Sequence, residues 1–260
     1  MPRAILLVMD SVGVGGAIDS DKYFNGSISD SGSNTILNIA KACESGIASE
    51  GRTGPLRVPT LQSLGLGNAI SLSTGDTAPN IPIVEKGAAY AVAAPVSMGK
   101  DTITGHWELA GVPLDRDWHY FPDTDKAFDT ELVNLICDLG KLDGILGNCH
   151  ASGTEILNEL GEKHCQSGKP ICYTSADSVF QIAAHEEYFG LSRLYDLCHL
   201  LAPYLHKMNV GRVIARTFIG NNKSGWSRTI NRRDFAMAPP KKVLSEWMQE
   251  DGIETLALGK

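Results

Sequence analysis

The 260-residue sequence has no apolar run that approaches the roughly 18–20 residues needed to span a bilayer as a helix. It also lacks an excess of positive charge, since 23 Lys and Arg residues stand against 30 Asp and Glu residues, a formal net charge of −7. That balance argues against nucleic-acid binding through overall charge. Because the amino-terminal residues show no cleavage-site pattern, we expect a cytoplasmic protein without a membrane span.

Closely spaced cysteine or histidine pairs are missing as well. None of the six cysteines forms a Cys-x-x-Cys pair, and the seven histidines show no His-x-x-x-His spacing. Zinc sites usually need such pairs. In a sequence without a signal peptide, we interpret the cysteines as reduced, small apolar residues and not as a disulfide framework.

Apolar runs that alternate with helical patterns predict an α/β protein. Residues 3–9 and 87–95 are expected to form buried strands, with helices over 34–44, over 60–67 and from Asp101 onward. In the second half, we first predict a helix ending near 140, a helix over 154–165 and strands in KPICYTS and SVFQIAAHE. A helix over 191–207 and a strand in VGRVIARTFIG are expected next. The chain then continues with an irregular basic stretch over 221–240, a helix in KVLSEWMQE and a strand in ETLALG.

The order of these segments suggests one domain inserted into another. We expect the first part of a core domain over 1–116, an inserted cap domain over 117–235 and a return to the core over 236–260. Because the return holds only one helix and one strand, the core sheet is expected to be incomplete.

Asp10 follows the first predicted strand and precedes a glycine-rich turn. At the carboxyl edge of a parallel sheet, a carboxylate is well placed to hold a divalent metal ion. The alternative is that Asp10 only caps the turn. A dinucleotide-binding loop is disfavoured, because Gly-x-Gly-x-x-Gly would need glycine where this chain has Ile18.

Thr102 lies where a loop enters a predicted helix, within MGKDTITGHWE. A phosphoryl group on its hydroxyl would be stabilised by the helix N-terminus, with Lys100 and His106 as possible neighbours. The alternative is that Asp101 or Thr102 is only a helix cap.

Arginines on a predicted apolar strand, Arg212 and Arg216, need an anionic partner. Salt bridges are the usual partner, and a sugar phosphate held together with Ser175 and Asp177 is the functional alternative. The basic return stretch is interpreted either as a solvated surface or as positive charge near a crevice; its cations are Lys223, Arg228, Arg232 and Arg233.

The strings MDSVGVGG, SMGKDTITGHWE, YTSADSVFQIAAHE, VGRVIARTFIGN and NRRDFAMAPP together resemble the phosphopentomutases, a family of alkaline-phosphatase-like metalloenzymes. The resemblance implies an α/β core with an inserted cap and two Mn²⁺ ions. It also implies interconversion of ribose 1-phosphate and ribose 5-phosphate, or their deoxyribose equivalents, through a phosphothreonine primed by a sugar 1,5-bisphosphate.

Carried over by resemblance, Asp10 corresponds to a manganese ligand and Thr102 to the phosphothreonine that also faces the metals. Ser175, Asp177, Arg212 and Ile214 resemble residues that contact the ribose phosphate. Family members continue past the equivalent of Lys260, and the resemblance places the other metal ligands there. Two alternatives remain: a catalytically inactive fragment whose cap still binds ribose phosphate, and a metal-dependent phosphatase or phosphoglycerate-type mutase of the same superfamily.

Overall fold

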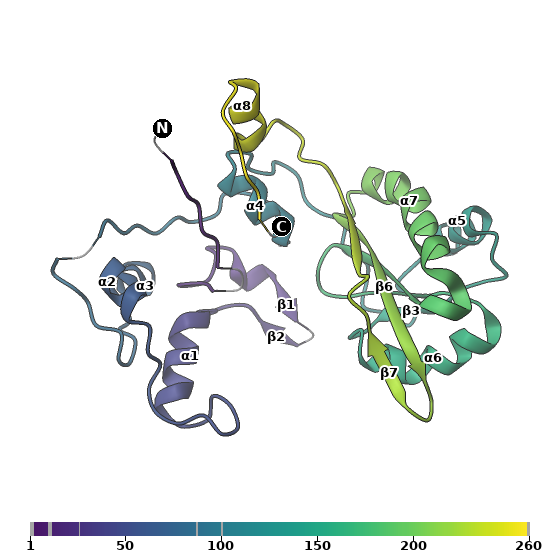
Figure 1. The fold of residues 1–260 in the computed structure, drawn as a ribbon, viewed down its shortest axis with the longest axis horizontal. Coiled ribbons are helices and arrows are strands. Elements are labelled where there is room, and N and C mark those ends of the chain that lie inside the picture. Colours follow the sequence, from purple (N-terminus) through teal and green to yellow (C-terminus); the bar gives the residue numbers. More distant parts are fainter. Residues whose placement is uncertain (1–2, 10–11, 26, 87, 100, 259–260) are drawn as a thin grey trace. The chain divides into compact units, whose positions relative to one another are not determined.

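The computed structural model describes residues 3–9, 12–25, 27–86, 88–99 and 101–258. The chain divides into two compact units, Met1–Pro95 and Val96–Lys260 (Figure 1). Each unit has buried apolar clusters of its own.

The regular structure of the first unit is mostly helical and lies around one small core, and the rest of its described residues are largely irregular. Asn34 caps its first long helix by accepting a hydrogen bond from the Leu37 backbone N–H at 3.3 Å, as the sequence predicts. A single helix expected over 60–67 is instead two, because Gly65 adopts a φ of 99° and ends the first of them. The elements are η1 (Ser20–Lys22), β1 (Phe24–Asn25), β2 (Ile28–Ser29), α1 (Thr35–Glu44), α2 (Pro59–Leu64) and α3 (Leu66–Thr74).

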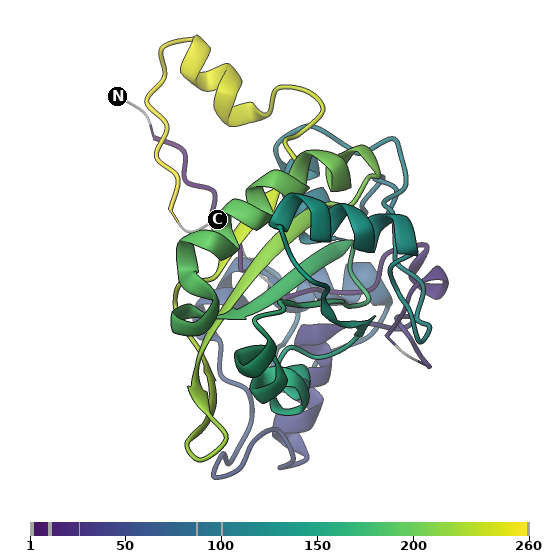
Figure 2. The ribbon, with the colours of Figure 1, turned by 90° about the vertical axis from the view of Figure 1, so that its right-hand side faces the viewer.

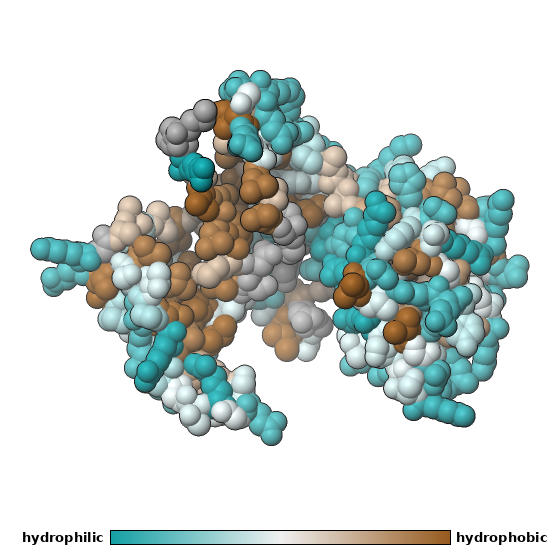
Figure 3. Space-filling model, viewed as in Figure 1, coloured by the Kyte–Doolittle hydropathy of each residue, from teal (hydrophilic) through white to brown (hydrophobic). Residues whose placement is uncertain are grey.

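The strands expected in this unit are absent from its described residues. Residues 3–9 form no strand, and Ile5, Leu6 and Leu7 are 90%, 73% and 83% exposed. Figure 3 shows apolar residues on the visible surface of this unit. Residues 88–95 form no strand either. Both predictions were wrong, because a strand needs a hydrogen-bonded neighbour and neither segment has one. Among the described residues of this unit, the only pair of strands is β1–β2.

The second unit is built on a mixed six-stranded sheet. Its path is β3-β4-β5-β6-β7, and β8 pairs with β6 beside β7. The pairs β3–β4 and β5–β6 are parallel, whereas β4–β5, β6–β7 and β6–β8 are antiparallel. The strands are β3 (Leu146–His150), β4 (Ile171–Thr174), β5 (Val179–His185), β6 (Arg212–Asn221), β7 (Gly225–Arg228) and β8 (Arg233–Ala236).

Helices cover the two faces of this sheet unequally. On one face, α5 (Thr130–Gly140) and α7 (Leu191–Lys207) lie side by side in front of the strands (Figure 2) and bury Phe180, Ile182 and Val213. On the other face, α6 (Glu155–Ser167) covers Ile171, Ala183 and Phe218. The whole of β5 is buried, since apolar residues cover both of its faces.

Most helices of this unit agree with the sequence prediction, and the strands agree less well. The helix over 191–207 and the strands that became β4, β5 and β6 are confirmed, together with α4 (Thr102–Leu109) and α8 (Leu244–Glu250). The stretch over 221–240 is not irregular throughout, because it contains β7 and β8. The strand expected in ETLALG is absent from its described residues, and Leu256 is 82% exposed.

Two features concern the chain as a whole. All six cysteines are free, as the sequence analysis expected. Within the part of the chain that the structure describes, no helix is long and apolar enough to cross a membrane.

Candidate functional site

The amino end of α4 presents Thr102 as its first residue. Asp101 caps the helix by accepting a hydrogen bond from the Ile103 backbone N–H at 3.0 Å. The Thr102 residue is exposed, and its carbonyl oxygen accepts a hydrogen bond from His106 Nδ1 at 2.8 Å. The hydroxyl-bearing residue is therefore accessible at the positive end of a helix dipole.

Arg212, at the start of β6, contacts the capping residue of α4. Its Nη2 atom lies 2.9 Å from Asp101 Oδ2 and 3.6 Å from Asp177 Oδ2, and its Nη1 atom lies 3.7 Å from Asp234 Oδ2. Three carboxylates thus surround one guanidinium group, which neutralises its charge. Arg212 Nε is buried and has no hydrogen-bond partner.

Burial dominates the electrostatics of Asp101. The side chain of Asp101 is 0% exposed, and desolvation raises its pKa, while Arg212 acts in the opposite direction. A carboxylate taken out of water is costly unless it is paired, so Asp101 and Arg212 depend on one another. Their ion pair links the start of α4, and with it Thr102, to the sheet edge.

The predicted substrate-binding residues come together in part. Asp177 reaches Arg212 from the β4–β5 connection, which also carries the partly exposed Ser175. Ile214 lies on β6 two residues beyond Arg212 but is only 1% exposed. A ligand can touch Ile214 only where neighbouring side chains move aside.

Two predicted site residues, Asp10 and Lys100, lie outside the described residues. Thr104, the third residue of α4, is buried and accepts a hydrogen bond from Trp118 Nε1 at 2.7 Å, so it supports the packing of α4. Among the described residues, no group of three or more His, Cys, Asp or Glu side chains is placed to hold a metal ion.

Sequence reasoning missed two carboxylates of this site, Asp101 and Asp234. Asp101 was considered only as a cap, and Asp234 was not considered.

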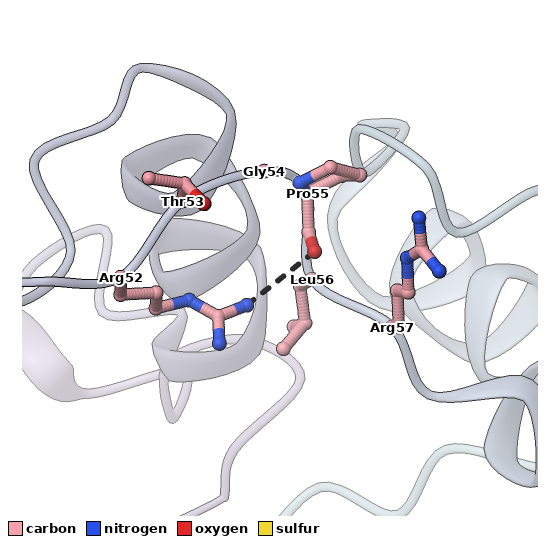
Figure 4. A pocket seen from close by; sticks show the side chains of 6 residues that line it. All are labelled: Arg52, Thr53, Gly54, Pro55, Leu56 and Arg57. Carbon is pink, nitrogen blue, oxygen red and sulfur yellow. Dashed lines mark hydrogen bonds between the residues drawn. The ribbon is translucent and has the colours of Figure 1, made fainter.

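A cavity of about 260 Å³ in the first unit does not form a comparable site. It is lined by the contiguous residues 52–57. Arg52 donates to the Pro55 carbonyl oxygen, and Arg57 points away on the other side of the Pro55–Leu56 stretch (Figure 4). The two cations therefore do not converge on one ligand.

Comparison with models of known protein families finds no match. Comparison with curated proteins finds relatives named phosphopentomutase that align with the whole chain. The chain is 51% identical over 261 residues to the one from Shewanella woodyi and 49% identical over 267 residues to the one from Psychromonas ingrahamii. It is 49% identical over 263 residues to the one from Agrobacterium fabrum.

The chain is homologous to the phosphopentomutases along its full length. It spans 63–64% of the length of these phosphopentomutases, which is slightly less than two thirds. The alignments cover 100% of the chain and therefore include the segments that carry Thr102 and Arg212.

Proposed function

We propose that this chain provides phosphopentomutase function, the interconversion of (deoxy)ribose 1-phosphate and (deoxy)ribose 5-phosphate. The observation that carries the proposal is the identity of about half of all residues to curated phosphopentomutases along the whole chain. The net charge of −7 is compatible with a small-molecule substrate and gives no support for a nucleic-acid partner.

In the proposed reaction, Thr102 carries the phosphoryl group. The Oγ1–phosphorus bond breaks as a sugar hydroxyl forms a new bond to phosphorus, which yields a sugar bisphosphate. Thr102 then takes the other phosphoryl group, and the sugar monophosphate leaves with the position of its phosphate exchanged. The exposed location of Thr102 at the start of α4 supports this role, because the helix N-terminus stabilises negative charge there.

Asp177 and Ser175 are proposed to orient the sugar. Asp177 is partly exposed and lies 3.6 Å from Arg212, so its carboxylate can accept hydrogen bonds from sugar hydroxyls without losing its cationic neighbour. Arg212 contacts both Asp177 and Asp101, the residue that precedes Thr102. This division of roles depends on the ion pair of Asp101 with Arg212.

The resemblance also implies two Mn²⁺ ions, whose chemistry when bound is to neutralise phosphoryl oxygens and activate the threonine hydroxyl. The described residues contain no cluster of metal-ligating side chains, and Asp10 lies outside them. They therefore do not form a two-manganese site by themselves. Manganese, the sugar 1,5-bisphosphate activator and a cytoplasmic location stay predictions.

The finer architecture is proposed on the same basis. It comprises an alkaline-phosphatase-like core with an inserted cap over 117–235; the six-stranded sheet from β3 at Leu146 to β8 at Ala236 ends one residue beyond this range. The exact division into 1–116, 117–235 and 236–260 stays a prediction.

The test of the proposal is phosphoryl transfer from ribose 1,5-bisphosphate, labelled in phosphorus, to the protein in the presence of Mn²⁺. We expect wild-type protein to become labelled and Thr102→Ala to remain unlabelled. Thr130→Ala is a matched control, because Thr130 also follows a capping aspartate, Asp129, as the exposed first residue of a helix.

Labelling of Thr130→Ala should equal that of wild type. Label that persists on Thr102→Ala would contradict the assigned phosphoryl acceptor. In parallel, conversion of ribose 1-phosphate to ribose 5-phosphate should fall below detection in Thr102→Ala and be unchanged in Thr130→Ala.

A further inference from the structure

Glu108 occupies an electrostatically unfavourable position in α4. It lies in the last turn of this eight-residue helix, where the carbonyl groups form the negative end of the helix dipole. No lysine or arginine lies in α4 to offset the charge of its carboxylate. Residues that oppose a local preference in this way are commonly found where the tertiary structure or the function compensates for them.

The carboxylate of Glu108 binds the backbone of the segment that precedes α4. Its Oε1 atom accepts a hydrogen bond from the Val96 N–H at 2.7 Å, and its Oε2 atom accepts one from the Ser97 N–H at 2.9 Å. Such charge-assisted hydrogen bonds are stronger than neutral ones. Burial acts to raise the pKa of Glu108, but the hydrogen bonds from the Ser97 hydroxyl and from both N–H groups lower it below its usual value.

Ser97 extends this contact to the segment that follows α4. Its hydroxyl oxygen accepts a hydrogen bond from the Leu114 N–H at 2.9 Å, and the Met98 N–H donates to the Leu114 carbonyl oxygen at 3.0 Å. Leu114 is buried in the apolar cluster that packs against α4. Hydrogen bonds therefore join the segment before α4 both to the helix and to the buried cluster beside it.

Apolar burial does little to hold residues 96–98. Val96 and Met98 are 74% and 46% exposed. The backbone comes close to a buried side chain only at the next residue, since Gly99 has a φ of 85° and an added Cβ would lie 2.6 Å from Trp118 Cδ1. The course of the chain from 96 to 98 therefore depends on its polar contacts, of which the carboxylate of Glu108 makes two.

The segment that Glu108 holds leads directly to Thr102. Asp101 follows Ser97 by four residues and caps α4 by accepting a hydrogen bond from the Ile103 N–H at 3.0 Å. A shift of the backbone at Ser97 is passed along this short stretch to the capping residue and to the first turn of α4. A displacement of about 1 Å at a reacting group can lower a rate by about a hundredfold.

We propose that Glu108 is a positioning residue for phosphoryl transfer. Its carboxylate fixes the backbone of residues 96–98 and thereby holds the amino end of α4, so that Thr102 meets the phosphorus atom in the reactive geometry. Glu108 acts through the backbone in this role and contacts no reacting atom. The part in phosphoryl transfer rests on the proposed function, whereas the positioning of the amino end of α4 does not.

The first test measures the rate at which Thr102 takes up label from ribose 1,5-bisphosphate with Mn²⁺, as a function of the bisphosphate concentration. We expect Glu108→Gln to lower the rate at saturation about tenfold, because its amide can accept only one of the two N–H groups, and Glu108→Ala to lower it about a hundredfold. The concentration at half-saturation should stay within about twofold of wild type, since Glu108 does not contact the ligand.

Glu246→Gln is the matched control. Glu246 is also a helical glutamate whose Oε2 atom accepts a backbone N–H, from Val243 at 2.9 Å, but it lies in α8. The same chemical change there should leave the labelling rate within about twofold of wild type. Circular dichroism and urea denaturation verify that all variants are folded to the same extent, which separates a change in rate from a loss of folded protein.

Amide hydrogen exchange tests the positioning without substrate or metal. Measured residue by residue by NMR, exchange of the Val96, Ser97 and Ile103 N–H groups should be about fivefold faster or more in Glu108→Gln, because the loop no longer holds the cap of α4 in place. Glu246→Gln should leave these rates unchanged. Faster exchange at Ile103 supports the positioning of α4 even where the wild-type protein takes up no label, an outcome that contradicts only the proposed function.

Three results would overturn the proposal. The first is labelling of Glu108→Ala at the wild-type rate. The second is acceleration of exchange confined to Val96 and Ser97, because the effect of Glu108 would then end within the loop. The third is a rise in the half-saturating concentration that accounts for the slower labelling, because Glu108 would then serve ligand binding.

Discussion

His164 shows how one side chain can make stability depend on pH. It is fully buried in α6, its Nδ1–H donates to the Lys169 carbonyl oxygen at 2.7 Å, and its Nε2 accepts from the His185 backbone N–H at 2.9 Å. The second contact requires the neutral ring, because a protonated Nε2 cannot accept a hydrogen bond. Burial lowers the pKa of His164, against the opposing effect of the Lys169 carbonyl.

The sign of the resulting pH dependence follows from linkage. Below about pH 6.5 the unfolded chain binds a proton at this histidine and the folded chain does not, so the free energy of unfolding falls as pH falls. The loss is at most about 1.4 kcal/mol per pH unit from this group. Urea denaturation at pH 7.5 and 5.5 should show a smaller difference for His164→Gln than for wild type, whereas a variant of the exposed His199, His199→Gln, should retain the wild-type difference. An unchanged difference in His164→Gln would contradict this account.

Strand β3 depends on a glycine at its second residue. Gly147 has a φ of 82°, and an added Cβ would lie 2.5 Å from the Cys172 carbonyl oxygen of β4. The β3–β4 register also shifts between Gly147 and Cys149. We expect Gly147→Ala to lower the free energy of unfolding by about 2–4 kcal/mol, since both strained backbone and a backbone clash oppose it.

Gly168→Ala separates the effect of the backbone conformation from the effect of the backbone clash. Gly168 follows α6 with a φ of 69°, yet nothing lies within 4 Å of an added Cβ. It should lower the free energy of unfolding by only about 1 kcal/mol, because only the backbone conformation is unfavourable. Urea denaturation measures both variants, and equal losses would show that the contact with Cys172 is unimportant.

At the scale of the whole molecule, the second unit has its own buried clusters. All residues of the two clusters that cover its sheet lie between 121 and 235. We therefore expect a protein consisting of residues 96–260 to fold alone, with one cooperative urea transition and the helical circular dichroism of α5, α6 and α7. A broad, non-cooperative transition would show that this unit needs residues 1–95. The first unit gives a weaker expectation, because its apolar residues 5–7 are exposed.

The sequence by itself determined most of the helices and the family resemblance. Capping residues such as Asn34 and Asp101 are local signals. The apolar stripe of α7 likewise predicts a helix over 191–207, which is the range that the structure shows. These features depend on residues three or four positions apart, so a linear reading detects them.

Only the tertiary structure decided which strands form and which charges meet. Residues 3–9 are as apolar as a buried strand but remain unpaired among the described residues, because strand hydrogen bonds come from distant segments. The ion pair of Asp101 with Arg212 joins residues 111 positions apart. The same holds for Tyr173, Arg216 and Arg228, whose shared face follows from the register of four strands and not from their spacing in the sequence.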